Sequence, residues 1–145
     1  MNYEDREEWF KWYCQQIEKE KPRAKFHGKF LCPCCYMPTL TRNGGWDTCP
    51  ICEWEDDGQD SDDADIVRGG PNQSYSLKEA RENFAKFGSM YRPSDTHSFE
   101  RRKKLMPFAQ RMHRAFWKAM QTKSEEDWKS ALETRHEFFA ELSRE

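Results

Sequence analysis

Cysteines are the residues with the clearest chemistry in this chain of 145 residues, which contains six of them. Two Cys-x-x-Cys turns, Cys32-Pro-Cys-Cys35 and Cys49-Pro-Ile-Cys52, are separated by thirteen residues. Each turn places two thiolates at one corner of a site, and two such turns complete a tetrahedral shell around a metal ion. We therefore predict a Zn²⁺ site whose ligands are Cys32, Cys35, Cys49 and Cys52.

Some alternatives stay open at this point. Tetrathiolate geometry also suits iron in a rubredoxin-like site, and a dithiol redox pair would need only one of the two turns. We take Cys34 as the cysteine that does not bind the metal, because the pair 32/35 repeats the spacing of 49/52. The alternative is that Cys34 binds the metal in place of Cys35. Cys14 lies far away in the sequence, so we expect an ordinary core cysteine.

Four thiolates would close the coordination shell, whereas a catalytic zinc keeps one position open for water. Zinc deaminases place His-x-Glu upstream of Pro-Cys-x-x-Cys, but here His27 is followed by Gly28 and Lys29. Signatures of P-loops, zinc proteases, serine hydrolases and dinucleotide-binding folds do not occur in the sequence. We therefore expect a structural site in a protein that is not an enzyme.

An acidic segment follows the second turn, with eight carboxylates in residues 53–65. Such a segment could meet a basic protein surface, and we predict an interface around Glu55, Asp56, Asp57 and Asp60. The alternative is a solvated loop beside the metal site. The basic run Arg101-Arg-Lys-Lys104 suggests a different function, a zinc ribbon that binds nucleic acid, although such runs are commonly solvated.

The elements that must position these residues can also be predicted. Amphipathic spacing predicts a helix over residues 2–20, with one of its aromatic residues Trp9, Phe10 and Trp12 left exposed. Residues 39–42 and 45–48 should form a hairpin around Asn43-Gly44. Further helices are expected over 77–87, which begins with a capping box at Ser76, over 107–121, and from 124 onward as an antiparallel partner. The predicted fold class is α+β, a small zinc ribbon with a short hairpin among about four helices.

Length and charge suggest how the chain is organised. We expect one domain over 1–145, made of an N-terminal helical region 1–28, a metal-binding region 29–92 and a helical hairpin 93–145. The first 91 residues carry 12 Lys+Arg and 17 Asp+Glu, and the remainder carries 12 and 9. The charged N-terminus and the lack of a long apolar run predict a cytoplasmic protein that does not enter a membrane, and in that compartment thiols stay reduced.

Several motifs resemble one known family. Cys32-Pro-Cys-Cys-Tyr36, Cys49-Pro-Ile-Cys-Glu-Trp-Glu-Asp-Asp57, Gly70-Pro-Asn72 and Ser76-Leu-Lys-Glu-Ala-Arg-Glu-Asn-Phe84 resemble the bacterial cysteine-rich CPCC family, over about residues 30–92. The family often has glycine where this chain has Tyr36. By gene context, some members resemble immunity proteins that accompany secreted toxins. The resemblance therefore implies a protein partner, such as a toxin domain with a cationic cleft. The excess of carboxylates and the lack of a sustained basic face make nucleic acid a less suitable partner.

Overall fold

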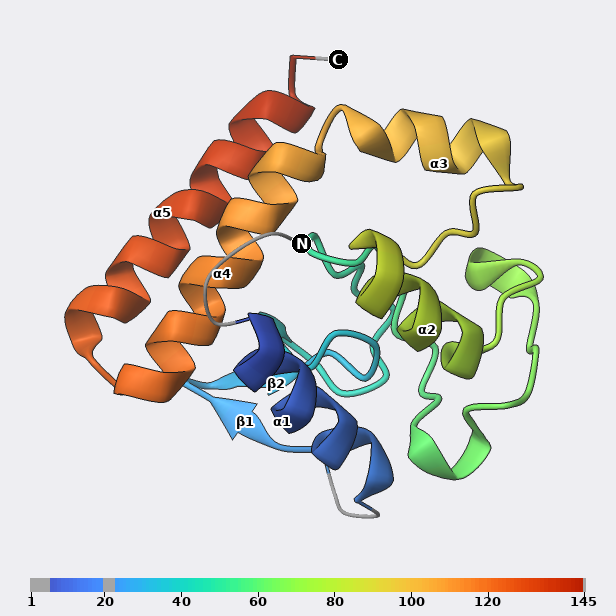
Figure 1. Cartoon of the computed structure of the whole chain (residues 1–145), viewed down its shortest axis with the longest axis horizontal. Helices are drawn as coiled ribbons and strands as arrows, with labels where there is room; N and C mark the ends of the chain where they lie inside the picture. Colours follow the sequence, from blue (N-terminus) through green and yellow to red (C-terminus); the bar gives the residue numbers. More distant parts are fainter. Residues whose placement is uncertain (1–5, 20–22, 145) are drawn as a thin grey trace. The chain divides into compact units, whose positions relative to one another are not determined.

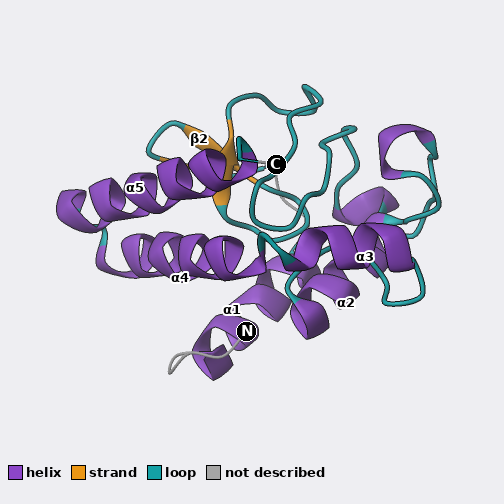
Figure 2. Cartoon of the chain, turned by 90° about the horizontal axis from the view of Figure 1, so that it is seen from above, coloured by secondary structure: helices purple, strands orange, loops and turns teal. Residues whose placement is uncertain are grey.

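The computed structural model describes residues 6–19 and 23–144, and these residues form an α+β fold as predicted. They contain five α-helices, one more than expected, and a small three-stranded antiparallel sheet (Figure 1). Much of the rest is loop, concentrated around the cysteine turns and the acidic segment (Figure 2). The chain divides into two compact units, up to Met90 and from Tyr91 onward. The single domain proposed above therefore stays a prediction.

Two helices of the first unit carry large aromatic residues into its core. α1 (Arg6–Glu18) buries Trp9, Tyr13 and Gln16, while residues 2–5 and 20 of the predicted helix lie outside the described ranges. Phe10 is the exposed aromatic residue that the sequence leads one to expect, at 40% exposure. Trp9 and Tyr13 stack with centroids 4.9 Å apart, and Phe84 lies edge-on to both.

α2 (Leu77–Phe87) has the predicted bounds, because local signals fix both of its ends. The Ser76 side chain accepts a hydrogen bond from the Glu79 N–H at 3.0 Å, which satisfies a donor at the start of the helix. Gly88 ends the helix with φ +82°, a conformation that glycine adopts without steric cost.

The sheet corrects the predicted hairpin. β1 (Lys25–Phe26), β2 (Lys29–Leu31) and β3 (Pro38–Leu40) are neighbours in that order, and His27-Gly28 forms the tight turn between the first two. β3 forms an antiparallel pair with β2, the strand before it in the sequence, so residues 39–42 and 45–48 do not pair with each other. The first cysteine turn consequently lies at the tip of the β2–β3 hairpin.

The second cysteine turn lies at the tip of a separate, irregular hairpin. Thr48 and Glu55 form an isolated bridge, flanked by hydrogen bonds from Cys49 N–H to the Trp54 carbonyl and from Asp56 N–H to the Asp47 carbonyl. Both turns are therefore held by antiparallel backbone pairing, whereas the sequence suggested one hairpin between them. The Asn43-Gly44 signal marks a loop instead.

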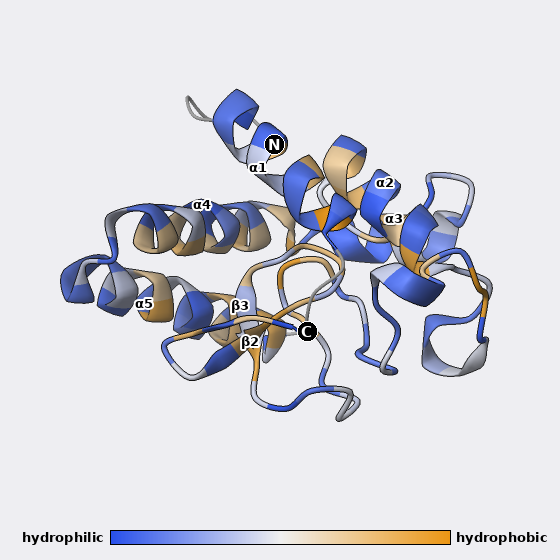
Figure 3. Ribbon diagram, turned by 90° about the horizontal axis from the view of Figure 1, so that it is seen from below, coloured by the Kyte–Doolittle hydropathy of each residue, from blue (hydrophilic) through white to orange (hydrophobic). Residues whose placement is uncertain are grey.

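The second unit consists of α3 (Thr96–Lys103), α4 (Met106–Thr122) and α5 (Glu125–Leu142). α4 and α5 form the predicted antiparallel hairpin, and Figure 3 shows apolar stretches along their facing sides. Phe116 and Trp128 meet there edge-on at 5.4 Å. α3 was not predicted. It contains Arg102, which is buried with its guanidinium 5.3 Å from the Phe138 ring, so the basic run 101–104 is not uniformly solvated.

Within the described ranges, no helix has both the length and the apolar character that crossing a bilayer requires.

Candidate metal centre

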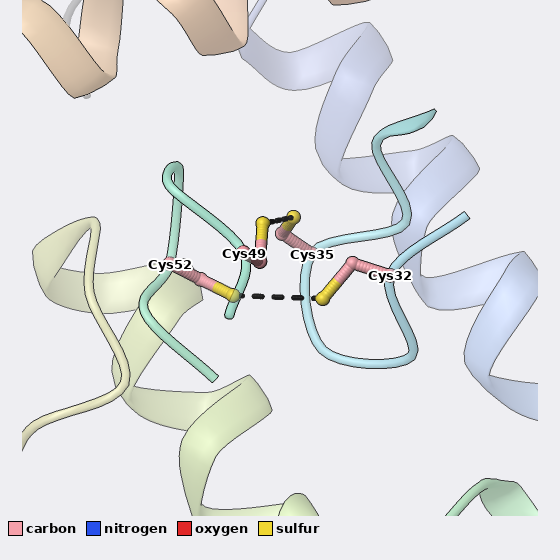
Figure 4. A group of neighbouring side chains, drawn as sticks. All are labelled: Cys32, Cys35, Cys49 and Cys52. Atoms are coloured by element: carbon pink, nitrogen blue, oxygen red, sulfur yellow. Dashed lines mark hydrogen bonds between the residues drawn. The ribbon is translucent and has the colours of Figure 1, made fainter. Parts of the chain in front are cut away.

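Four cysteine sulfur atoms converge in the first unit. The Sγ atoms of Cys32, Cys35, Cys49 and Cys52 all lie within 4.8 Å of one another, and these residues are fully buried. In Figure 4 the two turns face each other, with 3.6 Å between the sulfurs of Cys32 and Cys52 and of Cys35 and Cys49. Zn–S bonds of about 2.3 Å in a tetrahedron would separate the sulfurs by about 3.8 Å. Two of the sulfur pairs thus lie close to that spacing, and the four predicted ligands are near enough to one another to surround one metal ion.

The two turns have the same backbone conformation. The N–H of Tyr36 donates to the Cys32 carbonyl at 2.7 Å, and the N–H of Glu53 donates to the Cys49 carbonyl at 2.8 Å. Both donor residues have positive φ, 60° and 75°. This conformation costs a residue other than glycine about 1–2 kcal/mol. Here the Tyr36 hydroxyl accepts a hydrogen bond from Arg81 at 2.9 Å, which offsets part of that cost.

Hydrogen-bond donors inside the site are directed at the sulfurs. They are Cys34 N–H to Cys32 Sγ at 3.4 Å, Trp54 N–H to Cys52 Sγ at 3.4 Å and Thr39 Oγ1 to Cys49 Sγ at 3.1 Å. Such donors favour the thiolate form, which is the form that binds metals. The residues present therefore fit a metal-bound tetrathiolate. A bound ion would supply the positive charge that this cluster needs and would cross-link the two hairpins.

The metal-free cluster cannot readily hold four negative charges. Burial raises the pKa of the Cys32, Cys35 and Cys52 thiols above the ordinary value. Burial acts in the same direction on Cys49, but hydrogen bonds from the three other cysteines and from Thr39 outweigh it and lower the pKa of Cys49. Burial thus keeps thiols of the metal-free cluster protonated, so that metal binding must release protons.

Metal affinity should consequently depend steeply on pH. The loaded site holds fewer protons than the metal-free site, so acid favours the metal-free protein. For each proton released, the apparent affinity should fall about tenfold per pH unit of acidification, as long as the thiols are protonated in the metal-free state. Competition against a chelator of known affinity between about pH 6 and 8 measures this slope. An affinity independent of pH would contradict the protonation state inferred here.

The two remaining cysteines lie outside the cluster. Cys34 is fully buried, and its carbonyl accepts a hydrogen bond from the Tyr13 hydroxyl at 2.5 Å. Cys14 is partly exposed, so the expectation of an ordinary core cysteine is wrong. The reason is helical geometry: each residue turns by about 100°, and α1 buries the neighbouring Tyr13 instead.

Polar side chains behind the turns were missed by the sequence reasoning. Arg81 is buried on α2, and its Nε donates to the Pro33 carbonyl at 2.8 Å within the first turn. Asn72 pairs with the backbone of Glu55 on both sides, accepting from its N–H at 3.0 Å and donating to its carbonyl at 2.7 Å. Asn83 donates to the Met90 carbonyl at 2.9 Å. The signal was present, because all three belong to the motifs 70–72 and 76–84 quoted above.

The predicted acidic interface is placed quite differently. Asp56 is fully buried and forms an ion pair with Arg23 at 2.6 Å, while accepting a hydrogen bond from the Gly44 N–H at 2.7 Å. Asp57 is also buried, with Arg68 beside it at 4.0 Å. These two carboxylates therefore do not belong to an exposed surface, and that part of the prediction is corrected. Both carboxylates can be buried because each lies beside an arginine, and a buried charge needs a partner of opposite sign.

The other two predicted residues are partly exposed. Asp60 lies 3.2 Å from Arg23 and 3.6 Å from Arg81, which leaves its charge largely balanced. Glu55 is half-buried, and within the described chain its carboxylate forms no hydrogen bond or ion pair. Asp62 and Asp65, which were not singled out, are exposed. Glu55, Asp62 and Asp65 thus contribute solvent-facing acidity that no ion pair within the described chain balances.

These observations define the class of protein and then its family. The paired cysteine turns and their buried sulfur cluster are typical of a small metal-binding protein of the zinc-ribbon kind. A family model described as "Cysteine-rich CPCC" matches residues 30–104, and the chain belongs to this family. The match extends beyond the resemblance seen in the motifs. No curated protein and no solved structure matches the chain significantly.

Proposed function

We propose that the metal is Zn²⁺ and that its role is structural. The proposal is supported by four fully buried sulfurs in two equivalent turns, which leave no solvent-facing position where water or a substrate could bind. Iron would be accommodated by the same four thiolates, so geometry alone does not choose between the two ions.

Elemental analysis decides the identity of the ion. Protein produced in cells without added metal and purified without chelator should contain about one zinc per chain. Iron at that stoichiometry, with the visible absorption of an iron tetrathiolate, would overturn the zinc assignment. A folded protein without any metal would overturn the metal site itself.

We further propose that the chain is a non-enzymatic interaction protein, most specifically a cytoplasmic immunity protein that binds and neutralises a cognate bacterial toxin. Gene context in the resembling family supports the class. The half-buried Glu55 and the exposed Asp62 and Asp65 support a basic partner, such as a toxin domain with a cationic cleft. A loop anchored next to a metal-held turn can present such charges with little loss of conformational entropy on binding.

Growth protection tests this proposal. Co-expression with a toxin domain encoded by an adjacent gene should rescue growth, and the combined change Glu55→Lys and Asp62→Lys should abolish rescue and co-purification. The matched control, Glu126→Lys with Glu133→Lys, changes charge by the same amount at exposed positions of α5 and should protect fully. Zinc content and melting temperature must stay at the wild-type level in both variants.

The opposite results are equally informative. If no adjacent gene encodes a toxin, or if the chain neither binds nor protects, the immunity proposal fails. Retained protection by the charge-reversed protein would place the interface elsewhere. The nucleic-acid alternative instead predicts salt-sensitive binding to oligonucleotides through the exposed residues Arg101, Lys103 and Lys104, and loss of that binding when they become alanine.

A further inference from the structure

A groove opens between α1, α2 and the acidic segment, entirely within the first unit. Its volume is about 560 Å³, within the range of protein binding sites. It does not include the metal cluster, and it contains none of the residues discussed so far as an interface except Asp65. One wall is apolar, the opposite wall is charged, and the floor is held by hydrogen bonds. Together these features define what the groove would bind.

The α1 wall is an apolar stripe. Phe10, Cys14 and Ile17 line the groove at spacings of four and three residues, which is one face of a helix. Phe10 is 40% exposed, and the other two are half-buried. This stripe is adjacent to the buried face of α1, so the helix carries more apolar surface than the unit itself covers.

The opposite wall is charged. Lys78, Glu82 and Ala85 line it from α2, again at spacings of four and three, and Asp65 closes one end. Lys78, Glu82 and Asp65 are exposed, and within the described chain their side chains form no ion pair or hydrogen bond. The wall therefore offers two negative charges and one positive charge that are not satisfied internally.

The two helices run in opposite directions along the groove. Arg6 near the start of α1 donates to the carbonyl of Ala85 near the end of α2, at 2.6 Å. At the other end, the Tyr36 hydroxyl lies 3.5 Å from both the Gln16 carbonyl and Ser61 Oγ. Phe10 is consequently near the Glu82–Ala85 end, and Ile17 is near the Lys78–Asp65 end.

The floor connects the groove to the first cysteine turn. Tyr13 and Arg81 line it, and the same two side chains donate to the carbonyls of Cys34 and Pro33. Since both are buried and held by these bonds, the floor is fixed by the metal-binding turn. The groove therefore has a rigid shape in the loaded protein, which lowers the entropic cost of binding.

We propose that this groove binds an amphipathic α-helix of a protein partner. Both walls are helical rows with the spacing of three and four residues into which the side-chain ridges of another helix pack. The apolar residues of the incoming helix would cover Phe10, Cys14 and Ile17. Basic residues on one flank would meet Asp65 and Glu82, and an acidic residue would meet Lys78. The inference rests on the proposed interaction function and assigns it a surface separate from Glu55 and Asp62.

A displayed library of helical peptides, selected on the full-length zinc-loaded chain, tests the groove without knowledge of the partner. Selected peptides should repeat apolar residues at three- and four-residue spacing with basic residues on one flank. Their affinity should fall at least about tenfold on a Phe10→Asp, Ile17→Asp variant. The control Gln15→Asp changes an exposed residue of α1 outside the groove and should bind as wild type does.

Cys14 provides a second readout that needs no substitution. All six cysteines lie in the described ranges, and Cys14 alone is not buried, so a maleimide should modify it selectively. Bound peptide should slow this reaction, and prior modification should block peptide binding. A library that yields no binders, or binders unaffected by groove substitution and by Cys14 modification, overturns the inference. Toxin protection that survives the groove variant would overturn the groove and leave the proposed function standing.

Discussion

Replacing Cys49 by serine should abolish stoichiometric metal binding and unfold the first unit. In small zinc domains the metal supplies about 10–16 kcal/mol of apparent binding free energy, and that free energy is also folding free energy. The Sγ of Cys49 lies 3.6 Å from that of Cys35 and accepts a hydrogen bond from Thr39 at 3.1 Å, which places it within the sulfur cluster. Zinc analysis and thermal melts of the purified variant measure the loss.

Two matched variants make the comparison specific. Cys14→Ser removes a partly exposed thiol that is not one of the four clustered cysteines and should melt close to wild type. Cys34→Ser places a hydroxyl at a buried position outside the group of four, so it should cost about 1–3 kcal/mol while zinc content is retained. Loss of zinc from Cys34→Ser, with zinc retained by Cys35→Ser, would show that the ligands of the first turn had been wrongly chosen.

Changing Asp56 to asparagine should destabilise the protein by about 3 kcal/mol, because it removes the closer carboxylate partner of the buried Arg23 guanidinium and leaves the partly exposed Asp60 to balance its charge. The two side chains are 0% and 5% exposed and lie 2.6 Å apart. Burial alone would lower the pKa of Arg23, but the hydrogen bonds and charges of Asp56, and to a smaller extent of Asp60, raise it, so the arginine stays charged and needs a counter-charge. Denaturant unfolding of the two proteins gives the difference in free energy.

Asp62→Asn is the control for this experiment. Asp62 is exposed in the same segment, and its substitution should change stability by less than about 0.5 kcal/mol. The double variant Arg23→Met, Asp56→Asn should lose less than the sum of the single losses, because it removes both buried charges. Asp56→Asn with wild-type stability and impaired partner binding would instead restore Asp56 to the interface predicted from the sequence.

Local chemistry was readable from the sequence. The cysteine spacing identified the four sulfurs that converge, because two Cys-x-x-Cys turns together supply the four thiolates of a tetrahedral metal site. Ser76 and Gly88 fixed both ends of α2, because a helix terminus is decided by hydrogen bonds and φ angles within a few residues. The link at 122–124 likewise implied the α4–α5 hairpin, because a short connection forces antiparallel neighbours.

Pairing over long sequence distances was decided only by the tertiary structure. The hairpin predicted around Asn43-Gly44 does not form, because β2 pairs with one of its strands and the segment after Cys52 pairs with the other. A turn dipeptide reports local conformation, but it does not say which strand takes the hydrogen bonds. α3 was missed because its eight residues contain one large apolar side chain and therefore show no amphipathic period.

The acidic segment illustrates the same limit for charge. Eight carboxylates in thirteen residues suggest an exposed anionic surface. Asp56 is nevertheless buried in an ion pair with Arg23, which lies thirty-three positions earlier in the chain. Composition cannot show which of 24 Lys+Arg residues faces which carboxylate. The groove also depends on the tertiary structure. The apolar stripe of α1 can bind a partner only where α2 leaves it uncovered. The sequence thus determined the ligands and the helix ends, and the tertiary structure decided which charges and apolar side chains remain available to a partner.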